Sequence, residues 1–177
     1  MEDKKLIFLC GFMGCGKTTQ GKKLAKALGY HFIDLDEYTA NKYDKDITDI
    51  FQEFGEDEFR KIETTSLTEC ITDNMKTVIA LGGGTPCFNH NIELLKNSGT
   101  VVYLKMSADD LYKRLFKETA KRPLVANKET DELYVYIKDL LAKREVYYNQ
   151  STISVDGNLY EVDEMKKSIL EIVTPKA

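Results

Sequence analysis

The stretch Gly11–Thr19 reads GFMGCGKTT and fits the phosphate-loop pattern G-x-x-x-x-G-K-[ST]. An apolar run, residues 5–10, precedes it and predicts a strand, and an amphipathic run, residues 20–28, follows it and predicts a helix. Glycines let successive backbone N–H groups point at phosphate oxygens, while a lysine adds a cation and a threonine offers its hydroxyl to a magnesium ion. The stretch therefore predicts a nucleoside triphosphate site. Its candidate phosphate-binding residues are Gly14, Cys15, Gly16, Lys17, Thr18 and Thr19.

Size and charge restrict the class of protein. The chain has 177 residues, enough for one well-buried domain, so we expect a single domain over residues 1–177. Its formal net charge of −4 argues against a nucleic-acid or membrane-surface binder, because such proteins usually carry a basic face. Four cysteines without a C-x-x-C pair indicate reduced thiols, and the apolar run before Gly11 is too short for a signal peptide or a membrane span. We therefore expect a cytoplasmic protein whose partners are small molecules.

Strand and helix patterns alternate along the chain. After the first strand, the predicted strands are residues 30–34, 77–81, 100–104 and 152–155, with a helical pattern before each. A strand, helix, strand order implies parallel pairing, so the sequence predicts an α/β domain with a five-stranded parallel sheet. The helix before the last strand ends in Tyr147 and Tyr148, which we interpret as packing residues.

Two acids, Asp34 and Asp36, occupy alternate positions at the end of the second predicted strand. Alternate strand positions face the same side, and at the carboxyl end of a parallel strand that side looks into the ligand crevice. The alternative interpretation is a helix N-cap and a solvated acid.

Arg60 with Glu63, and the triple glycine Gly82–Gly84, each allow two interpretations. Arg60 and Glu63 lie one helical turn apart, and that spacing alone favours an exposed ion pair. Three glycines after an apolar strand serve either a tight turn or a bare backbone against which a ligand lies.

Basic residues gather between positions 105 and 128, where seven of them occur with three acids. In an acidic chain this excess indicates an anionic ligand nearby. Pro123 keeps Arg122 out of helical geometry, so the surrounding segment is either a mobile flap over the phosphates or an ordinary basic loop.

Taken together, six motifs in order along nearly the whole chain resemble shikimate kinase; they are GFMGCGKTT, FIDLDEY, IFQEFGEDEFRKIE, LGGGTPC, KRPL and KREVYY. The resemblance implies a three-layer P-loop fold with helices on both faces of the sheet, substrate-binding helices at about residues 37–73 and a mobile lid at about residues 113–128. It also implies that a monomer with bound Mg²⁺ transfers the ATP γ-phosphoryl group to the 3-hydroxyl of shikimate. That reaction would serve chorismate and aromatic amino-acid synthesis.

The resemblance assigns the acceptor side of the site by position. Asp36 would hold the substrate hydroxyls and take part in catalysis, and two arginines would bind the shikimate carboxylate beside a bare backbone. The substrate-binding residues that it implies are Asp36, Arg60, Gly83, Gly84 and Arg144. Glu63, one turn from Arg60, would hold that guanidinium in place.

The resemblance also assigns the residues that bind the ATP phosphates and the magnesium ion. The resemblance implies that Lys17 and Arg122 bind the ATP phosphates and balance the charge that develops on the transferred group. Thr18 and Asp34 would be the magnesium residues. The segment after Asp156 departs from the family, because it lacks the basic or amide contact that members often make with adenine, and Arg114 is the candidate for that contact.

Two other functions stay open on the sequence alone. A sibling such as gluconate kinase shares the phosphate loop but should lack the combination of paired acids, FR-x-x-E and triple glycine. A non-catalytic nucleotide-binding regulator should lack the acceptor-site residues.

Overall fold

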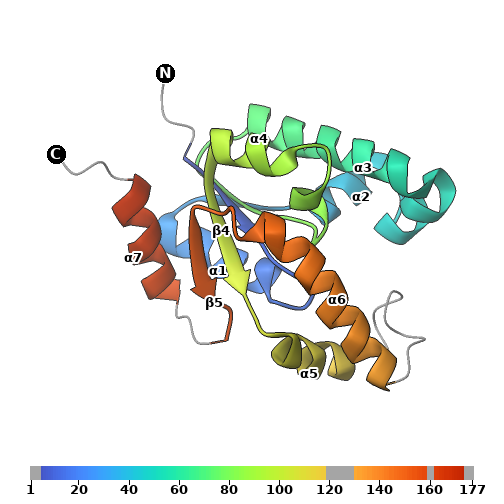
Figure 1. Ribbon diagram of the computed structural model, residues 1–177. Helices are drawn as coiled ribbons and strands as arrows, with labels where there is room; N and C mark the ends of the chain where they lie inside the picture. The colour runs from blue at the N-terminus through green and yellow to red at the C-terminus, as the bar shows by residue number, and fades with distance from the viewer. Residues whose placement is uncertain (1–4, 119–129, 159–161, 174–177) are drawn as a thin grey trace.

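The computed structural model describes residues 5–118, 130–158 and 162–173, and Figure 1 shows how their elements are arranged. Most of the predicted lid, with Arg122, lies outside these residues. The strands are β1 Leu6–Cys10, β2 His31–Asp34, β3 Thr77–Ala80, β4 Gly99–Lys105 and β5 Ile153–Asp156. The helices are α1 Lys17–Leu28, α2 Leu35–Tyr43, α3 Ile47–Asp73, the short 3-10 helix η1 Thr85–Cys87, α4 Asn91–Ser98, α5 Ala108–Glu118, α6 Thr130–Tyr148 and α7 Val162–Val173.

The strands form one sheet in the order β2-β3-β1-β4-β5, and every pairing is parallel. All residues of β1 and β3 are buried, which explains their continuous apolar sequences, because a central parallel strand is covered on both faces. The predicted α/β fold with a five-stranded parallel sheet is confirmed. With β1 between β3 and β4, the phosphate loop leaves the sheet at its centre.

Helices cover both faces of the sheet. Helices α1 and α7 pack against each other on one side, and α4 and α6 lie on the other side of β4 and β5 (Figure 1). The main core joins the central strands to these helices through residues such as Phe8, Leu24, Leu95, Ile137 and Ile169. The open carboxyl ends of the strands are thus the place where loops from several elements meet.

Helices α2 and α3 pack against each other, and a small second core lies beside them. Ile50, Phe59 and Ile62 form this cluster, with Tyr43 and Ile47 packed around it. Helix α3 is kinked at Gly55, whose φ of 77° and ψ of 172° are not helical. The two helices therefore have apolar packing of their own in addition to their contacts with the main core.

Candidate active site

The phosphate loop lies between β1 and α1, as predicted. Gly14 and Gly16 take φ angles of 81° and 96°, a left-handed conformation that favours glycine, and Gly16 is the N-cap of α1. The loop therefore brings its backbone to the amino-terminal end of a helix, where free N–H groups and the helix dipole attract an anion.

Lys17 folds back over this loop. Its Nζ donates to the carbonyl oxygens of Gly11 at 2.9 Å and Phe12 at 3.0 Å. An ammonium group has three N–H donors, so two of them hold the side chain in place and a third can reach a phosphate.

Thr18 and Asp34 meet directly, because the Thr18 hydroxyl donates to Asp34 Oδ2 at 2.7 Å. The Asp34 carboxylate also accepts from the backbone N–H groups of Asp36 at 3.1 Å and Glu37 at 3.5 Å, which makes it the N-cap of α2. The expectation that both acids stand on the strand is therefore wrong. The cap ends β2 at Asp34, and Asp36 lies in the first turn of a helix.

The Thr18–Asp34 pair fits a magnesium ion. The donors are a hydroxyl and a carboxylate, which are hard oxygen ligands, and the hydroxyl keeps free lone pairs while it donates to the acid. Magnesium in kinases is usually held by one or two protein oxygens and by substrate phosphates. The residues that the structure describes contain no group of three His, Cys, Asp or Glu side chains that could hold a metal ion.

Asp36 is a half-buried acid among other charges. Burial raises the pKa of its carboxyl to about 6, the negative charges of Asp34 and Glu63 add to the rise, and Lys17 and Arg60 oppose it. A carboxylate with this pKa is ionised at neutral pH and can still accept a proton from a neighbouring hydroxyl.

Arg60 and Glu63 form a buried pair, so the exposed ion pair favoured by their spacing is wrong. Arg60 Nη1 donates to Glu63 Oε2 at 2.9 Å, and the side chains are only 12% and 3% exposed. Thr85 explains the burial, because η1 covers this side of α3 and the Thr85 hydroxyl donates to Glu63 Oε1 at 2.6 Å. The Arg60 guanidinium also lies over the ring of Phe88, 4.1 Å from its centroid. Arg60 Nε is buried and has no hydrogen-bond partner among the described residues.

Close approach explains the triple glycine. A Cβ on Gly82 would lie 2.9 Å from Asp36 Oδ1 and 2.9 Å from Glu63 Oε1, and a Cβ on Gly84 would lie 2.7 Å from Arg60 Nη1. None of these glycines has a positive φ, so a turn conformation does not require them. The segment is a tight turn, because the Thr85 N–H donates to the Gly82 carbonyl oxygen at 3.2 Å, and its missing side chains leave room for the acid and the arginine. That a ligand lies against this backbone stays a prediction.

Gly83 joins this cluster to the phosphate loop. A Cβ placed on it would lie 3.1 Å from Arg144 Nη1 and 3.5 Å from the backbone nitrogen of Met13. Arg144, on α6, lies over the ring of Phe12, 5.5 Å from its centroid. The structure thus brings Asp36, Arg60, Gly83, Gly84 and Arg144 together beside the loop that holds Lys17 and Thr18.

Sequence reasoning missed two residues here. Tyr148, interpreted as packing, donates its hydroxyl to the Gly83 carbonyl oxygen, and Thr85 donates to Glu63. Tyr148 lies four residues after Arg144, so the two residues share one face of a helix. That spacing is the signal in the sequence that could have placed Tyr148 at the site.

Arg114 connects the phosphate loop to the segment after β5. Its guanidinium donates to the carbonyl oxygen of Cys15 at 3.5 Å, to that of Gly157 at 3.4 Å, and to Asn158 Oδ1 at 3.3 Å. The side chain therefore lies between the phosphate loop and the segment after β5, and its contact with adenine stays a prediction.

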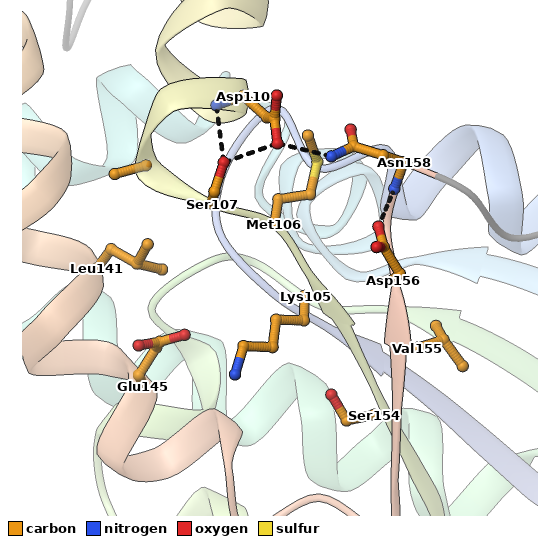
Figure 2. Close-up of a pocket in the computed structure, with 11 residues that line it drawn as sticks. Lys105, Met106, Ser107, Asp110, Leu141, Glu145, Ser154, Val155, Asp156 and Asn158 are labelled. Atoms are coloured by element: carbon orange, nitrogen blue, oxygen red, sulfur yellow. Dashed lines mark hydrogen bonds between the residues drawn. The ribbon is translucent and has the colours of Figure 1, made fainter.

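A separate pocket of about 480 Å³ lies between α6 and strands β4 and β5 (Figure 2). Lys105, Ser107, Glu145 and Asp156 are among its lining residues, and that lining includes none of the predicted site residues. Polar and apolar side chains both line this hollow, since Met106, Leu141 and Val155 also belong to it.

The parallel sheet, the phosphate loop with its lysine and threonine, and the adjoining acid and arginines define an ATP-dependent phosphotransferase of the P-loop class. The family model for shikimate kinase matches residues 13–174. The chain belongs to the shikimate kinase family, which confirms the resemblance seen in the sequence motifs.

Individual relatives agree with this assignment. The shikimate kinase of Azobacteroides pseudotrichonymphae genomovar. CFP2 is 49% identical over 83% of this chain and 86% of that protein. A crystal structure of shikimate kinase from Bacteroides thetaiotaomicron has a TM-score of 0.87 at 36% identity and covers 96% of this chain and 98% of its own. Shikimate kinase from Acinetobacter baumannii, solved in complex with shikimate, has a TM-score of 0.83 at 32% identity, with 97% and 96% covered.

The sibling considered from the sequence is more distant. A gluconokinase from Sinorhizobium meliloti has a TM-score of 0.60 at 19% identity, a likeness that shows the shared fold alone.

Proposed function

We propose that this chain transfers the γ-phosphoryl group of ATP to the 3-hydroxyl of shikimate, as a step in chorismate and aromatic amino-acid synthesis. One observation carries the proposal: an acid and two arginines converge on a bare glycine backbone that touches the phosphate loop. Phosphoryl transfer depends on positioning and charge balance, so an acceptor site must adjoin the nucleotide site in this way. The relative solved with shikimate supports the choice of acceptor.

Asp36 is the residue that receives the acceptor hydroxyl. Above a pH of about 6 its carboxyl is ionised and can hold the hydroxyl and take its proton during transfer. Lys17, held by two loop carbonyls, keeps one N–H for the outer phosphates, where negative charge develops.

Arg60 and Arg144 bind the carboxylate of the acceptor and so recognise it. They approach neighbouring residues of the glycine turn, Arg60 at Gly84 and Arg144 at Gly83. Among the described residues Arg60 Nε has no hydrogen-bond partner, and guanidinium groups bind planar carboxylates through paired N–H bonds. Glu63 and Thr85 keep the Arg60 side chain from turning away.

Thr18 and Asp34 would hold Mg²⁺ together with the ATP phosphates. When bound, the ion neutralises phosphate charge and orients the γ-phosphoryl group. Asp34 also caps α2, so it fixes the start of the helix that carries Asp36.

Other parts of the proposal rest on the sequence. Arg122 would bind the phosphates from a lid at about residues 113–128, and the chain would act as a monomer built from a single domain. A cytoplasmic location fits the free thiols of Cys10, Cys15, Cys70 and Cys87. In the described ranges, no helix has both the length and the apolar composition that a membrane crossing needs.

A coupled assay of ADP release tests the proposed reaction. We expect turnover with ATP, Mg²⁺ and shikimate, and none with gluconate or simple polyols. Transfer to gluconate but not to shikimate would support the sibling activity. Normal ATP binding without turnover of any acceptor would support a non-catalytic regulator.

Neutral analogues of shikimate test whether the site recognises the carboxylate of the acceptor. Two charge-assisted contacts of about 1.5–3 kcal/mol each predict that shikimate methyl ester loses at least tenfold in kcat/KM. Arg60→Ala and Arg144→Ala should each reduce the ratio of kcat/KM for shikimate to kcat/KM for its methyl ester. Equal turnover of acid and ester by the unmutated protein would disprove the carboxylate site.

A further inference from the structure

Tyr148 is a fully buried tyrosine at the end of α6 whose polar atom is aimed at the acceptor site. Its side chain is 0% exposed, and its hydroxyl donates to the Gly83 carbonyl oxygen. A buried phenol hydroxyl needs a hydrogen-bond partner, and the partner here is the backbone of a predicted acceptor-site residue 65 positions away in the sequence.

Helix α6 brings two side chains to Gly83. Tyr148 binds its carbonyl oxygen, and Arg144, one turn earlier, brings Nη1 to 3.1 Å from the position of a Cβ on Gly83. Because both side chains belong to one rigid helix, the hydrogen bond fixes where the Gly83 backbone lies relative to the Arg144 guanidinium.

Tyr148 is itself held firmly. Its ring packs against that of Tyr103 with centroids 5.1 Å apart, and the Tyr103 hydroxyl donates to Glu145 Oε1 at 3.0 Å. Glu145 follows Arg144 in α6 and points toward the pocket beside the sheet (Figure 2). Burial also keeps the pKa of Tyr148 well above its usual value, so the phenol stays protonated and remains a donor.

We infer that Tyr148 is a positioning residue that sets the register between Arg144 and the backbone of Gly83, and thereby selects acceptors that carry a carboxylate. The inference rests on the proposed function, in which Arg60 and Arg144 bind that carboxylate and the Gly83 backbone lies beside it. Tyr148 is fully buried, so we assign it no direct contact with ATP or the acceptor. Without its hydroxyl, the Gly83 carbonyl loses a buried partner and the peptide can rotate, which moves the acceptor's backbone contact away from the Arg144 guanidinium.

Tyr148→Phe tests this role, because it removes one oxygen and keeps the ring that packs against Tyr103. The matched control is Tyr147→Phe, which changes the neighbouring, half-buried tyrosine in the same way. Initial rates are measured with shikimate and with its methyl ester at saturating ATP, and again with varied ATP. For Tyr148→Phe we expect KM for shikimate to rise about tenfold and the preference for the acid over the ester to fall by about the same factor. KM for ATP should stay within about twofold.

The outcomes separate this inference from the proposed function. If the unmutated protein does not prefer the acid, the carboxylate site itself is wrong. If the unmutated protein prefers the acid and Tyr148→Phe keeps that preference, Tyr148 only packs, whatever its effect on melting temperature. Should Tyr148→Phe not fold, Tyr148→Met fills the space flexibly without a donor, and the same loss of preference is expected. A similar loss in Tyr147→Phe would also overturn the inference.

Discussion

Two glycine-rich segments, the phosphate loop and the turn Gly82–Gly84, lie side by side but need glycine for different reasons. Gly16 has a φ of 96°, and the nearest atom to a Cβ placed there is 3.7 Å away, so its conformation alone requires glycine. At Gly82 the backbone has no positive φ, and a Cβ would lie 2.9 Å from three side-chain oxygens. Gly16 thus shapes the backbone and Gly82 leaves space, while Gly11 and Gly14 of the phosphate loop do both, because a Cβ on them would lie 2.8 Å from Cys15 Sγ and 3.0 Å from Leu115 Cδ2.

Because of this difference, we expect each segment to serve one substrate: the phosphate loop serves ATP, and the turn Gly82–Gly84 serves the acceptor. The backbone shape of the phosphate loop is what an anion with many oxygens requires. The space at the turn is what allows an acid and an arginine to approach the backbone, where we propose that the acceptor binds. Damage to each segment should therefore affect a different substrate.

The largest expected effect is that of Gly82→Ala. The added methyl group must displace Asp36, Glu63 or Thr85, and a misplacement of about 1 Å can reduce the rate a hundredfold. We expect kcat/KM for shikimate to fall about a hundredfold or more, while ATP affinity measured by calorimetry stays within about threefold. Gly16→Ala is the matched control and should weaken ATP binding more than it lowers kcat/KM for shikimate. If Gly82→Ala lowered ATP affinity as much as kcat/KM for shikimate, the assignment of one substrate to each segment would be wrong.

Lys17→Ala should have the next largest effect, on the phosphate side. Loss of one charge-assisted donor costs about 1.5–3 kcal/mol, which corresponds to roughly a ten- to hundredfold fall in kcat/KM. The loop also loses the two hydrogen bonds to Gly11 and Phe12. Steady-state kinetics with varied ATP measure the effect. Turnover equal to that of the unmutated protein would rule out the assignment of the loop.

Asp36→Asn should stabilise the protein at neutral pH. The carboxyl has a pKa of about 6 when folded and about 3.9 when unfolded, so ionisation opposes folding once the pH rises above about 4. The amide removes this cost, and we expect a gain of about 1–3 kcal/mol at pH 8 that shrinks as the pH falls from about 6 to about 4. Urea unfolding at several pH values measures it. A gain that does not vary with pH would mean that burial does not raise this pKa.

Gly29→Ala should have the smallest effect and isolates backbone strain. Gly29 caps the end of α1 with a φ of 68°, and no atom lies within 4 Å of a Cβ placed there. Left-handed alanine costs about 1 kcal/mol, so thermal unfolding should show a loss of that size and the kinetics should not change. Altered kinetics in this variant would show that strain in a remote glycine reaches the site.

The fold could be predicted from local sequence patterns because its central strands are apolar throughout and the phosphate loop lies between a predicted strand and a predicted helix. The acceptor site was less readable, because burial there depends on elements far apart in the chain. Arg60 and Glu63 have the spacing of a surface pair, and only the packing of η1 against α3 makes them a buried one.

Two errors have the same origin. Asp34 and Asp36 alternate as strand residues do, yet the Asp34 carboxylate starts a helix by accepting its first N–H groups. Tyr148 looks like an aromatic packing residue, and its hydrogen bond to Gly83 spans 65 positions of sequence. A one-dimensional pattern gives the period of an element but not which long-range partner a polar atom finds.

The small second core beside α2 and α3 has an evolutionary consequence. Ile50, Phe59 and Ile62 pack with Tyr43 and Ile47, apart from the large core that supports the phosphate loop. Substitutions among these residues can reshape the helices that bear Asp36 and Arg60 at little cost to the folding of the rest of the chain. We therefore expect substitutions in this small core to alter the choice of acceptor more than the binding of ATP, so that selection on the acceptor can act on one part of the chain alone.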